Sequence, residues 1–217
     1  MHTLKKITLL ITTFIIAISC ETDENKASDE YLLNSIYNSK ITSETLTSNE
    51  KNDLLFSREE EKLARDVYIN SYNKYGLSIF NNISSSEQKH MDSVLKALIK
   101  YGLEDPASTS IGVFSNQTLQ NLYNELVDKS NTSLTDALIV GCFIEDLDIK
   151  DLDDLISRTD ENMIINTYES LKCGSRNHLR SFINQLESIK VNYEPQYISL
   201  EDFNAIINSD LEHCGNN

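Results

Sequence analysis

The sequence contains little glycine and proline, with six glycines and two prolines among 217 residues. Folds made only of β-strands need frequent tight turns, and these two residues favour such turns. Their scarcity therefore argues against an all-β fold. Hydrophobic residues make up 40% of the chain, which is enough for a buried core, and long stretches have helical periodicity. We therefore expect an all-α domain.

Positive charge is also scarce. The chain has 19 Lys and Arg residues against 34 Asp and Glu residues, which gives a formal net charge of −15. This surplus of acids argues against nucleic acid as a partner and against electrostatic binding to an anionic membrane surface. Most of the acids are expected on a solvated surface, but four of them occupy positions that should be buried.

Cysteine is too rare and too irregularly spaced for a disulfide framework or a zinc ribbon. Beyond Cys20 the chain has Cys142, Cys173 and Cys214, and an odd number of cysteines cannot pair completely. A disulfide between Cys142 and Cys173 is one pairing that the sequence leaves open. We interpret Cys142 as a small core residue, with a role as metal ligand or redox partner as the alternative.

The first long hydrophobic run, from Ile7 to Ile18, is too short to cross a bilayer comfortably. It follows two lysines and ends at small residues before Cys20, a pattern that resembles a bacterial lipobox. We expect residues 1–19 to be a lipoprotein signal peptide and Cys20 to become the lipidated N-terminus. The acidic residues 21–24 resemble the export signal of surface lipoproteins, which favours an extracytoplasmic protein anchored to the outer membrane or the cell surface. A plain secretory signal or an uncleaved anchor is the alternative.

Composition divides the remaining chain into three parts. We expect a flexible polar tether over residues 20–52, a helical domain over 53–208 and a disordered tail over 209–217. Ser57 and Glu60 have the spacing of a capping box, so the first helix should begin there. Long helices are expected over 57–75, 79–101, 134–156 and 160–190, with short helices over 117–129 and 199–208. The long connection between the second and third long helices matches the crossover of ferritin-like four-helix bundles.

Polar residues interrupt the apolar face of each long helix. In a packed bundle, core-facing residues recur in alternating steps of three and four. On the second helix these steps run from Phe80 to Leu98, yet Glu87 and His90 stand in the middle of the stripe. Residues three apart on a helix share a face, so each such pair can point at one spot. The polar residues on the four stripes are Glu61, Glu87, His90, Glu145, Asp148, Ser175 and His178.

These interruptions predict a metal site. A buried carboxylate must be neutralised, paired or bound to a metal ion, because leaving it charged and unpaired is very costly. Arg65 and Arg176 could offset part of the charge. Two divalent cations would supply +4 against the four carboxylates, with both histidines as neutral ligands. Carboxylate and imidazole together suit iron, manganese or zinc, and Glu-x-x-His on an inward face is typical of di-iron and di-manganese bundles.

At these residues the chain resembles the ferritin-like family called domain of unknown function 2202. The resemblance covers about residues 54–207, and its motifs occur in order. That family is largely uncharacterised, so the resemblance implies a fold and a metal site more than a reaction. The motifs are Arg58–Tyr68, Ser86–Asp92, Ile144–Ile149 and Gly174–Arg180.

The wider relatives implied by the resemblance are rubrerythrins and ferritins, which allow a homodimer and an iron site of two ions, or of one. Ser175 departs from their pattern, because a bridging Glu is expected there, and Asp148 is the candidate replacement. Glu169 should not fill this gap, since it lies nine residues before His178 and half a turn out of phase. The metal ligands expected are Glu61, Glu87, His90, Glu145, Asp148 and His178. The residues expected beside them are Arg65, Tyr68, Cys142, Ser175 and Arg176.

Three functions remain open from the sequence. The first is a redox metalloenzyme, an oxidase, peroxidase or ferroxidase in which an oxidant binds an open metal position. The second is a lipoprotein that binds one or two metal ions without turnover, which the loss of a carboxylate at Ser175 favours. The third is a structural bundle whose buried acids are paired with Arg65 and Arg176 in a salt-bridge network.

Overall fold

The computed structural model describes residues 46–215, which form six α-helices and no β-strand. None of the helices in this range is long and apolar enough to span a membrane. The predicted signal peptide, Cys20 and most of the predicted tether lie outside the described residues. The helices are α2 (Ser48–Tyr75), α3 (Ser78–Lys100), α4 (Gln117–Ser130), α5 (Leu134–Ile156), α6 (Asn162–Ser188) and α7 (Leu200–Ile207).

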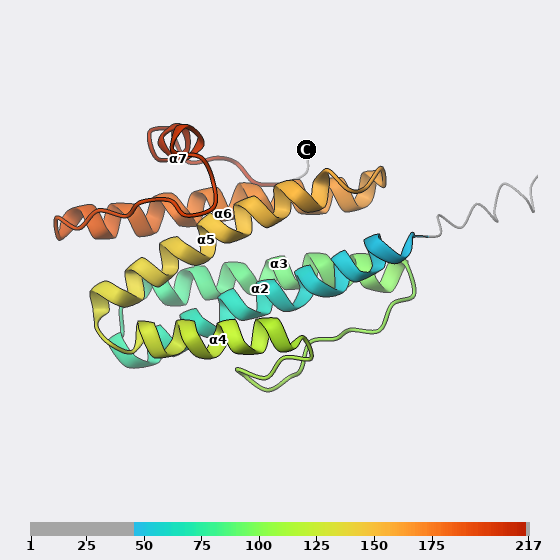
Figure 1. Ribbon diagram of the computed structural model, residues 1–217, viewed down its shortest axis with the longest axis horizontal. Helices are drawn as coiled ribbons and strands as arrows, with labels where there is room; N and C mark the ends of the chain where they lie inside the picture. Colours follow the sequence, from blue (N-terminus) through green and yellow to red (C-terminus); the bar gives the residue numbers. More distant parts are fainter. Residues whose placement is uncertain (1–45, 216–217) are drawn as a thin grey trace, which may run out of the picture. The chain divides into compact units, whose positions relative to one another are not determined.

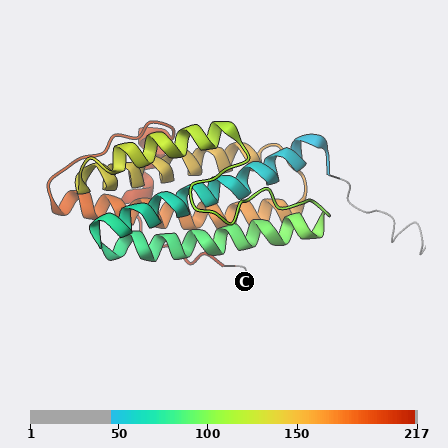
Figure 2. The ribbon, with the colours of Figure 1, turned by 90° about the horizontal axis from the view of Figure 1, so that it is seen from below.

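The four long helices pack as two antiparallel pairs. Helix α2 lies along α3, and α5 lies along α6; the pairs join where α3 meets α6 and α2 meets α5. Residues 101–133 connect α3 to α5 and return along the length of the helices, so that α3 and α5 run in the same direction (Figure 1). Within this connection α4 covers α2 and α5, as the turned view in Figure 2 also shows.

The structure confirms the predicted helices to within two residues at each end, except at the start of the first. Helix α2 begins at Ser48, where Thr47 and Glu50 form the capping box. The prediction that Ser57 and Glu60 cap this helix is wrong, because both are buried inside it. The polar residues 48–52, which were predicted to belong to the tether, are therefore part of helix α2. One face of this extra segment is anchored, since Thr159 donates its hydroxyl hydrogen bond to Glu50 at 2.6 Å.

Apolar side chains form two separate clusters along the bundle. One includes Leu63 on α2, Phe80 on α3 and Phe182 on α6. The other includes Leu54 on α2 and Val94 on α3, with Leu171 on α6. On each of these three helices the polar residues of the interrupted stripes fall between the two clusters, so they occupy a polar layer with apolar packing on either side.

A buried ion pair attaches the long connection to α2. Lys62 and Asp66 are fully buried, with Nζ 2.5 Å from Asp66 Oδ2. Lys62 Nζ also donates to the Ser110 carbonyl at 2.9 Å, and the Gly112 N–H donates to Asp66 Oδ2 at 2.9 Å. The charges of this pair thus satisfy backbone groups of the connection that would otherwise be left without partners.

Two further buried acids hold loops in the same way. Glu59 accepts hydrogen bonds from the backbone N–H groups of Ser115 and Asn116, just before α4 begins. Asp146 accepts from the Tyr193 hydroxyl at 2.7 Å and from the Ile198 N–H at 2.9 Å, which fixes the segment between α6 and α7. Charged residues next to the polar layer therefore position the loops.

Removing Asp66 should test the strength of this attachment. We expect Asp66→Ala to lower the free energy of unfolding by about 3–5 kcal/mol, because Lys62 would keep a buried charge without its partner. The matched control is Asp154→Ala, which breaks the pair with Lys150 at the same spacing but between side chains that are 41% and 50% exposed. That control should cost less than about 1 kcal/mol. Urea unfolding measures both, and equal losses would contradict the assignment.

Candidate metal centre

The polar layer brings together side chains from all four long helices. Glu61 comes from α2, Glu87 and His90 from α3, Glu145 from α5 and His178 from α6. The four long helices enclose these groups, and each of the three glutamates is 1–2% exposed. The apolar clusters on either side explain this burial.

The five side chains form two groups that share Glu87. One group is Glu61, Glu87 and His90; the other is Glu87, Glu145 and His178. In each group, one potential ligand atom from every residue lies within 4.8 Å of the others. Each residue thus offers an oxygen or nitrogen atom to one of two adjacent positions.

The two oxygens of Glu87 face different histidines. Oε2 lies 2.8 Å from His90 Nδ1, and Oε1 lies 2.8 Å from His178 Nδ1. His90 Nδ1 is also 3.0 Å from Glu61 Oε2, and His178 Nδ1 is 3.4 Å from Glu145 Oε2. The Nδ1 atom of each histidine is therefore flanked by two carboxylate oxygens. The Glu87 carboxylate contributes one oxygen to each histidine and so connects the two positions.

Several of these atoms are buried without a satisfactory hydrogen bond. Glu61 Oε1, Glu87 Oε1 and His178 Nδ1 have no hydrogen-bond partner. The last two lie 2.8 Å apart, which is an ion-pair contact without hydrogen-bond geometry. Buried polar atoms are nearly always satisfied, so unsatisfied donors and acceptors around one point favour a ligand there.

Burial and mutual repulsion disturb the protonation of the layer. Burial raises the pKa of Glu61 to about 7, although His90 opposes the shift. Burial likewise raises the pKa of Glu145, and the pKa of Asp148 rises well above its usual value through burial and through Glu61. Burial alone would lower the pKa of His178, but Glu87 and Glu145 raise it to about 10. If all four carboxylates were ionised, their charge would exceed what two protonated histidines can balance, so burial and mutual repulsion favour protonation of some of these acids.

Two hydroxyl groups contact the second group from outside. The Tyr68 hydroxyl donates to Glu145 Oε1 at 2.5 Å, and Ser86 Oγ lies 2.9 Å from His178 Nε2. Tyr68 was expected beside the ligands. The sequence did not indicate Ser86, because it precedes Glu87 and falls outside the periodic stripe.

Asp148 lies next to the two groups but is not a member of either. Its carboxylate and the Leu171 carbonyl, at 3.0 Å, both lie within hydrogen-bond distance of Ser175 Oγ, so the single hydroxyl hydrogen is shared between these two acceptors. Glu60 is a further buried acid of this region that the sequence did not indicate. Its pKa is raised well above the usual value by burial, then by Asp148 and Asp151.

Gly174 makes room for one histidine ring. A Cβ atom at this position would lie 2.4 Å from His90 Nε2, too close for any side chain without movement of the ring. The ring of His90 stacks on that of His178 with centroids 5.4 Å apart. Gly174 therefore lets α6 approach α3 closely enough for both rings to enter one layer.

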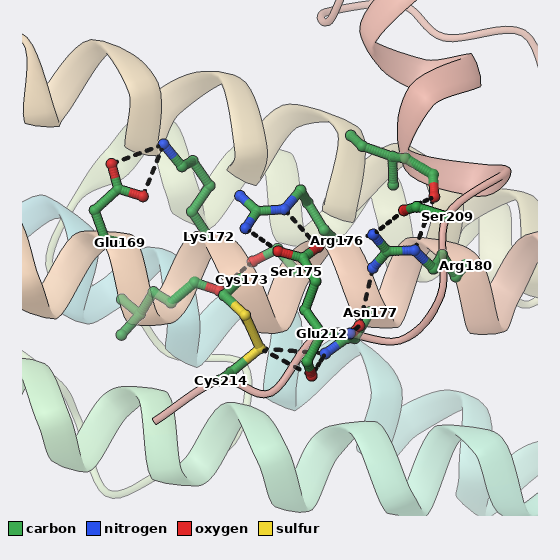
Figure 3. Close-up of polar contacts among 12 residues, drawn as sticks. Glu169, Lys172, Cys173, Ser175, Arg176, Asn177, Arg180, Ser209, Glu212 and Cys214 are labelled. Atoms are coloured by element: carbon green, nitrogen blue, oxygen red, sulfur yellow. Dashed lines mark hydrogen bonds and ion pairs between the residues drawn. A yellow bond between two sulfur atoms is a disulfide. The ribbon is translucent and has the colours of Figure 1, made fainter. Parts of the chain in front are cut away.

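The arginines do not compensate the buried acids. Arg65 donates to Asp66 and Gln88, and Arg176 forms an ion pair with Glu212 in the C-terminal segment. Figure 3 shows Arg176 and Arg180 both directed at Glu212. The possibility that Arg65 and Arg176 offset part of the carboxylate charge through direct contact is therefore not realised.

The pairing of Cys142 with Cys173, which the sequence left open, does not form, because the disulfide joins Cys173 to Cys214 (Figure 3). Cys142 is free and buried, and burial raises the pKa of its thiol. The disulfide and the ion pairs of Glu212 hold the C-terminal segment against α6, so its described part, up to residue 215, departs from the predicted disordered tail. Glu169 is exposed and pairs with Lys172, as its helical phase predicted.

Filling the space at Gly174 should disturb His90 selectively. We expect Gly174→Ala to displace the His90 ring and to cost about 1–3 kcal/mol of stability through overpacking. Gly141→Ala is the matched control, because its Cβ would press on the Phe182 ring at 2.6 Å but not on a histidine. Imidazole NMR signals of His90 should shift in the first variant and stay in place in the second. An unmoved His90 signal in Gly174→Ala would refute this packing.

Known proteins provide three comparisons. Residues 50–210 match an uncharacterized protein domain, DUF2202. The uncharacterized protein MJ0754 of Methanocaldococcus jannaschii is 50% identical over 177 residues, which cover 81% of this chain and 96% of that protein. The crystal structure of hypothetical protein MJ0754 from Methanococcus jannaschii has a TM-score of 0.76 and 52% identity, and the match covers 77% of this chain and 96% of that one. Together, the domain match and the relative with half its residues identical show that the chain belongs to the DUF2202 family.

Proposed function

We propose that this protein binds two divalent metal ions side by side in a ferritin-like four-helix bundle. Glu61, Glu87 and His90 would hold one ion, and Glu87, Glu145 and His178 the other. The observation that carries the proposal is the placement of Glu87, whose two oxygens each lie 2.8 Å from a different histidine Nδ1. A carboxylate in this position can bridge two cations.

The donor set fits iron, with manganese or zinc as the alternatives. Carboxylate oxygens and imidazole nitrogens suit all three metals, and no thiolate belongs to either group in the described part of the chain. Two divalent cations would favour the ionised forms of Glu61, Glu145 and Asp148, whose pKa values are raised by burial first and by neighbouring carboxylates second. The parallel course of α3 and α5 supports a ferritin-like bundle fold. The resemblance to ferritin-like proteins supports iron as the metal.

A bound iron pair would supply two-electron redox chemistry toward dioxygen or peroxide, as in an oxidase, peroxidase or ferroxidase. The protein's own contribution is to exclude water from the layer and to orient the ligands, with Tyr68 holding Glu145. Ser175 favours a second candidate function, metal binding without turnover. Ser175 stands where a second bridging carboxylate is expected, and its hydroxyl forms a hydrogen bond with Asp148 instead.

A purely structural salt-bridge network is the weakest of the three interpretations. It requires Arg65 and Arg176 to neutralise the buried acids, yet Arg65 contacts Asp66 and Arg176 contacts Glu212. The histidines are then the only cationic groups in contact with the layer among residues 46–215. Two imidazoles leave several buried carboxylates to be protonated or bound to metal.

We also propose that the mature protein is lipidated at Cys20 and lies outside the cytoplasm. The lipobox-like sequence before Cys20 supports an anchor to a bacterial outer membrane or cell surface. The disulfide between Cys173 and Cys214 is consistent with this location, because disulfides persist mainly in oxidising compartments.

Metal stoichiometry tests the proposal directly. Protein purified without chelators and loaded with iron or manganese should contain two ions per chain by elemental analysis. Glu61→Ala should retain one ion, and Glu87→Ala should lose both because both groups share this carboxylate. Glu169→Ala, which removes an exposed acid on α6, should retain two and serves as the control. A wild-type protein without bound metal would refute the proposed function.

Reaction with peroxide separates the two candidate functions. The ferrous protein is mixed with hydrogen peroxide in a stopped-flow spectrometer. We expect an absorbance change at a rate that saturates with peroxide, followed by repeated turnover when a reductant is present. Two bound ions with no turnover would instead support metal binding alone.

A further inference from the structure

The two halves of the polar layer are held unequally by their surroundings. In the half formed by Glu87, Glu145 and His178, both nitrogens of the His178 ring have polar neighbours. Nδ1 faces the carboxylates, and Nε2 lies 2.9 Å from Ser86 Oγ. Glu145 is fixed as well, because Oε1 accepts from the Tyr68 hydroxyl at 2.5 Å while Oε2 remains directed at His178.

The half formed by Glu61, Glu87 and His90 lacks such supports. Glu61 Oε1 is buried without a hydrogen-bond partner. His90 Nε2 is next to Gly174, which has no side chain to offer, and no group within residues 46–215 forms a hydrogen bond with this nitrogen. Glu61 Oε1 and His90 Nε2 therefore have no hydrogen bonds to other residues of the described chain.

This difference should affect metal affinity. A hydrogen bond to the outer nitrogen of a histidine selects the tautomer whose other nitrogen has a free lone pair, and it fixes the orientation of the ring. Ser86 Oγ can accept a hydrogen bond from His178 Nε2 in this way, which leaves Nδ1 ready to bind a cation. Removing such a partner typically weakens metal binding by about 10–100-fold. Ligands without these partners must be ordered when the ion binds, which costs conformational entropy.

We infer that the two positions fill in a fixed order. The position of Glu87, Glu145 and His178 binds the first ion tightly, and the position of Glu61, Glu87 and His90 binds the second more weakly and exchanges it more readily. Ser86 and Tyr68 are the positioning residues that create the difference. This inference rests on the proposed function, because it concerns the same pair of ions.

The shared carboxylate links the two steps. Glu87 Oε2 already faces His90 Nδ1 at 2.8 Å, and an ion bound beside His178 would keep the Glu87 side chain in this orientation. Its charge would also repel a second ion. A weaker second step is expected, since the repulsion adds to the lack of supports at Glu61 and His90.

Titration with Mn²⁺ tests the order of filling. Calorimetry, together with electron paramagnetic resonance of the bound ion, should resolve two steps that differ at least tenfold in dissociation constant. Glu61→Ala should keep the tight step with its affinity changed less than threefold. Glu145→Ala should lose the tight step. The opposite pattern in these two variants would overturn the assignment.

Variants of the positioning residues test the cause. Ser86→Ala and Tyr68→Phe should each weaken the tight step by about 10–100-fold. Ser86→Thr should restore the affinity, because it keeps the hydroxyl. Ser85→Ala is the matched control, since Ser85 is the exposed neighbour of Ser86 and its hydroxyl donates to the Asn81 carbonyl. Tyr168→Phe controls for the loss of a buried hydroxyl in the apolar cluster of Leu54 and Leu171.

The outcomes separate this inference from the proposed function. If the wild-type protein binds no Mn²⁺, Fe²⁺ or Zn²⁺, the metal pair itself is refuted. If two ions bind with equal affinities, or if Ser86→Ala weakens both steps alike, the metal pair stands and the order of filling is refuted. Thermal unfolding of the metal-free variants identifies any that are misfolded, and Ser86→Thr then provides the folded comparison.

Discussion

Burial of negative charge is the constraint on which this structure depends. Glu61, Glu87 and Glu145 converge on two histidines inside the bundle, and water is nearly excluded from all three. Carboxylates in such a place must be protonated, paired or bound to cations. The two apolar clusters enforce this condition, because they pack the four long helices on either side of the polar layer. The packing that stabilises the fold therefore also buries these carboxylates, which must be neutralised by protons or by cations.

Charged residues along α2 serve two different purposes. Successive residues on a helix are rotated by about 100° relative to one another, so neighbours in sequence face different partners. Glu61 points into the polar layer, while Glu59 and Lys62 bind backbone groups of the connection between α3 and α5. This division explains how so many charges can be buried in one segment. Glu59 and Lys62 have hydrogen-bond partners in the connection, whereas Glu61 Oε1 in the layer has none.

Helical periodicity revealed which residues face the core, and it indicated the convergence of Glu61, Glu87, His90, Glu145 and His178. It could not reveal what lies opposite a residue on the outside of its helix. Arg176 therefore looked available to the buried acids, although it pairs with Glu212, 36 residues away. Ser86 and the disulfide partner of Cys173 were missed for the same reason, since contacts between distant segments leave no local pattern. The start of α2 was missed because residues 48–52 are polar and resemble a tether in composition.

Ser175 decides how open the proposed metal pair would be. Its hydroxyl holds the Asp148 carboxylate, and Asp148 consequently lies beside the two groups without joining them. Glu87 is then the only carboxylate among the described residues that both groups share. Two cations joined by a single carboxylate would each have three protein ligands, fewer than the four to six that these metals usually take. The remaining coordination positions would be filled by water or a small substrate, which is the condition that catalysis at a metal requires. A serine at this place would therefore weaken the binding of the proposed metal pair and, by the same geometry, leave coordination positions open for a substrate.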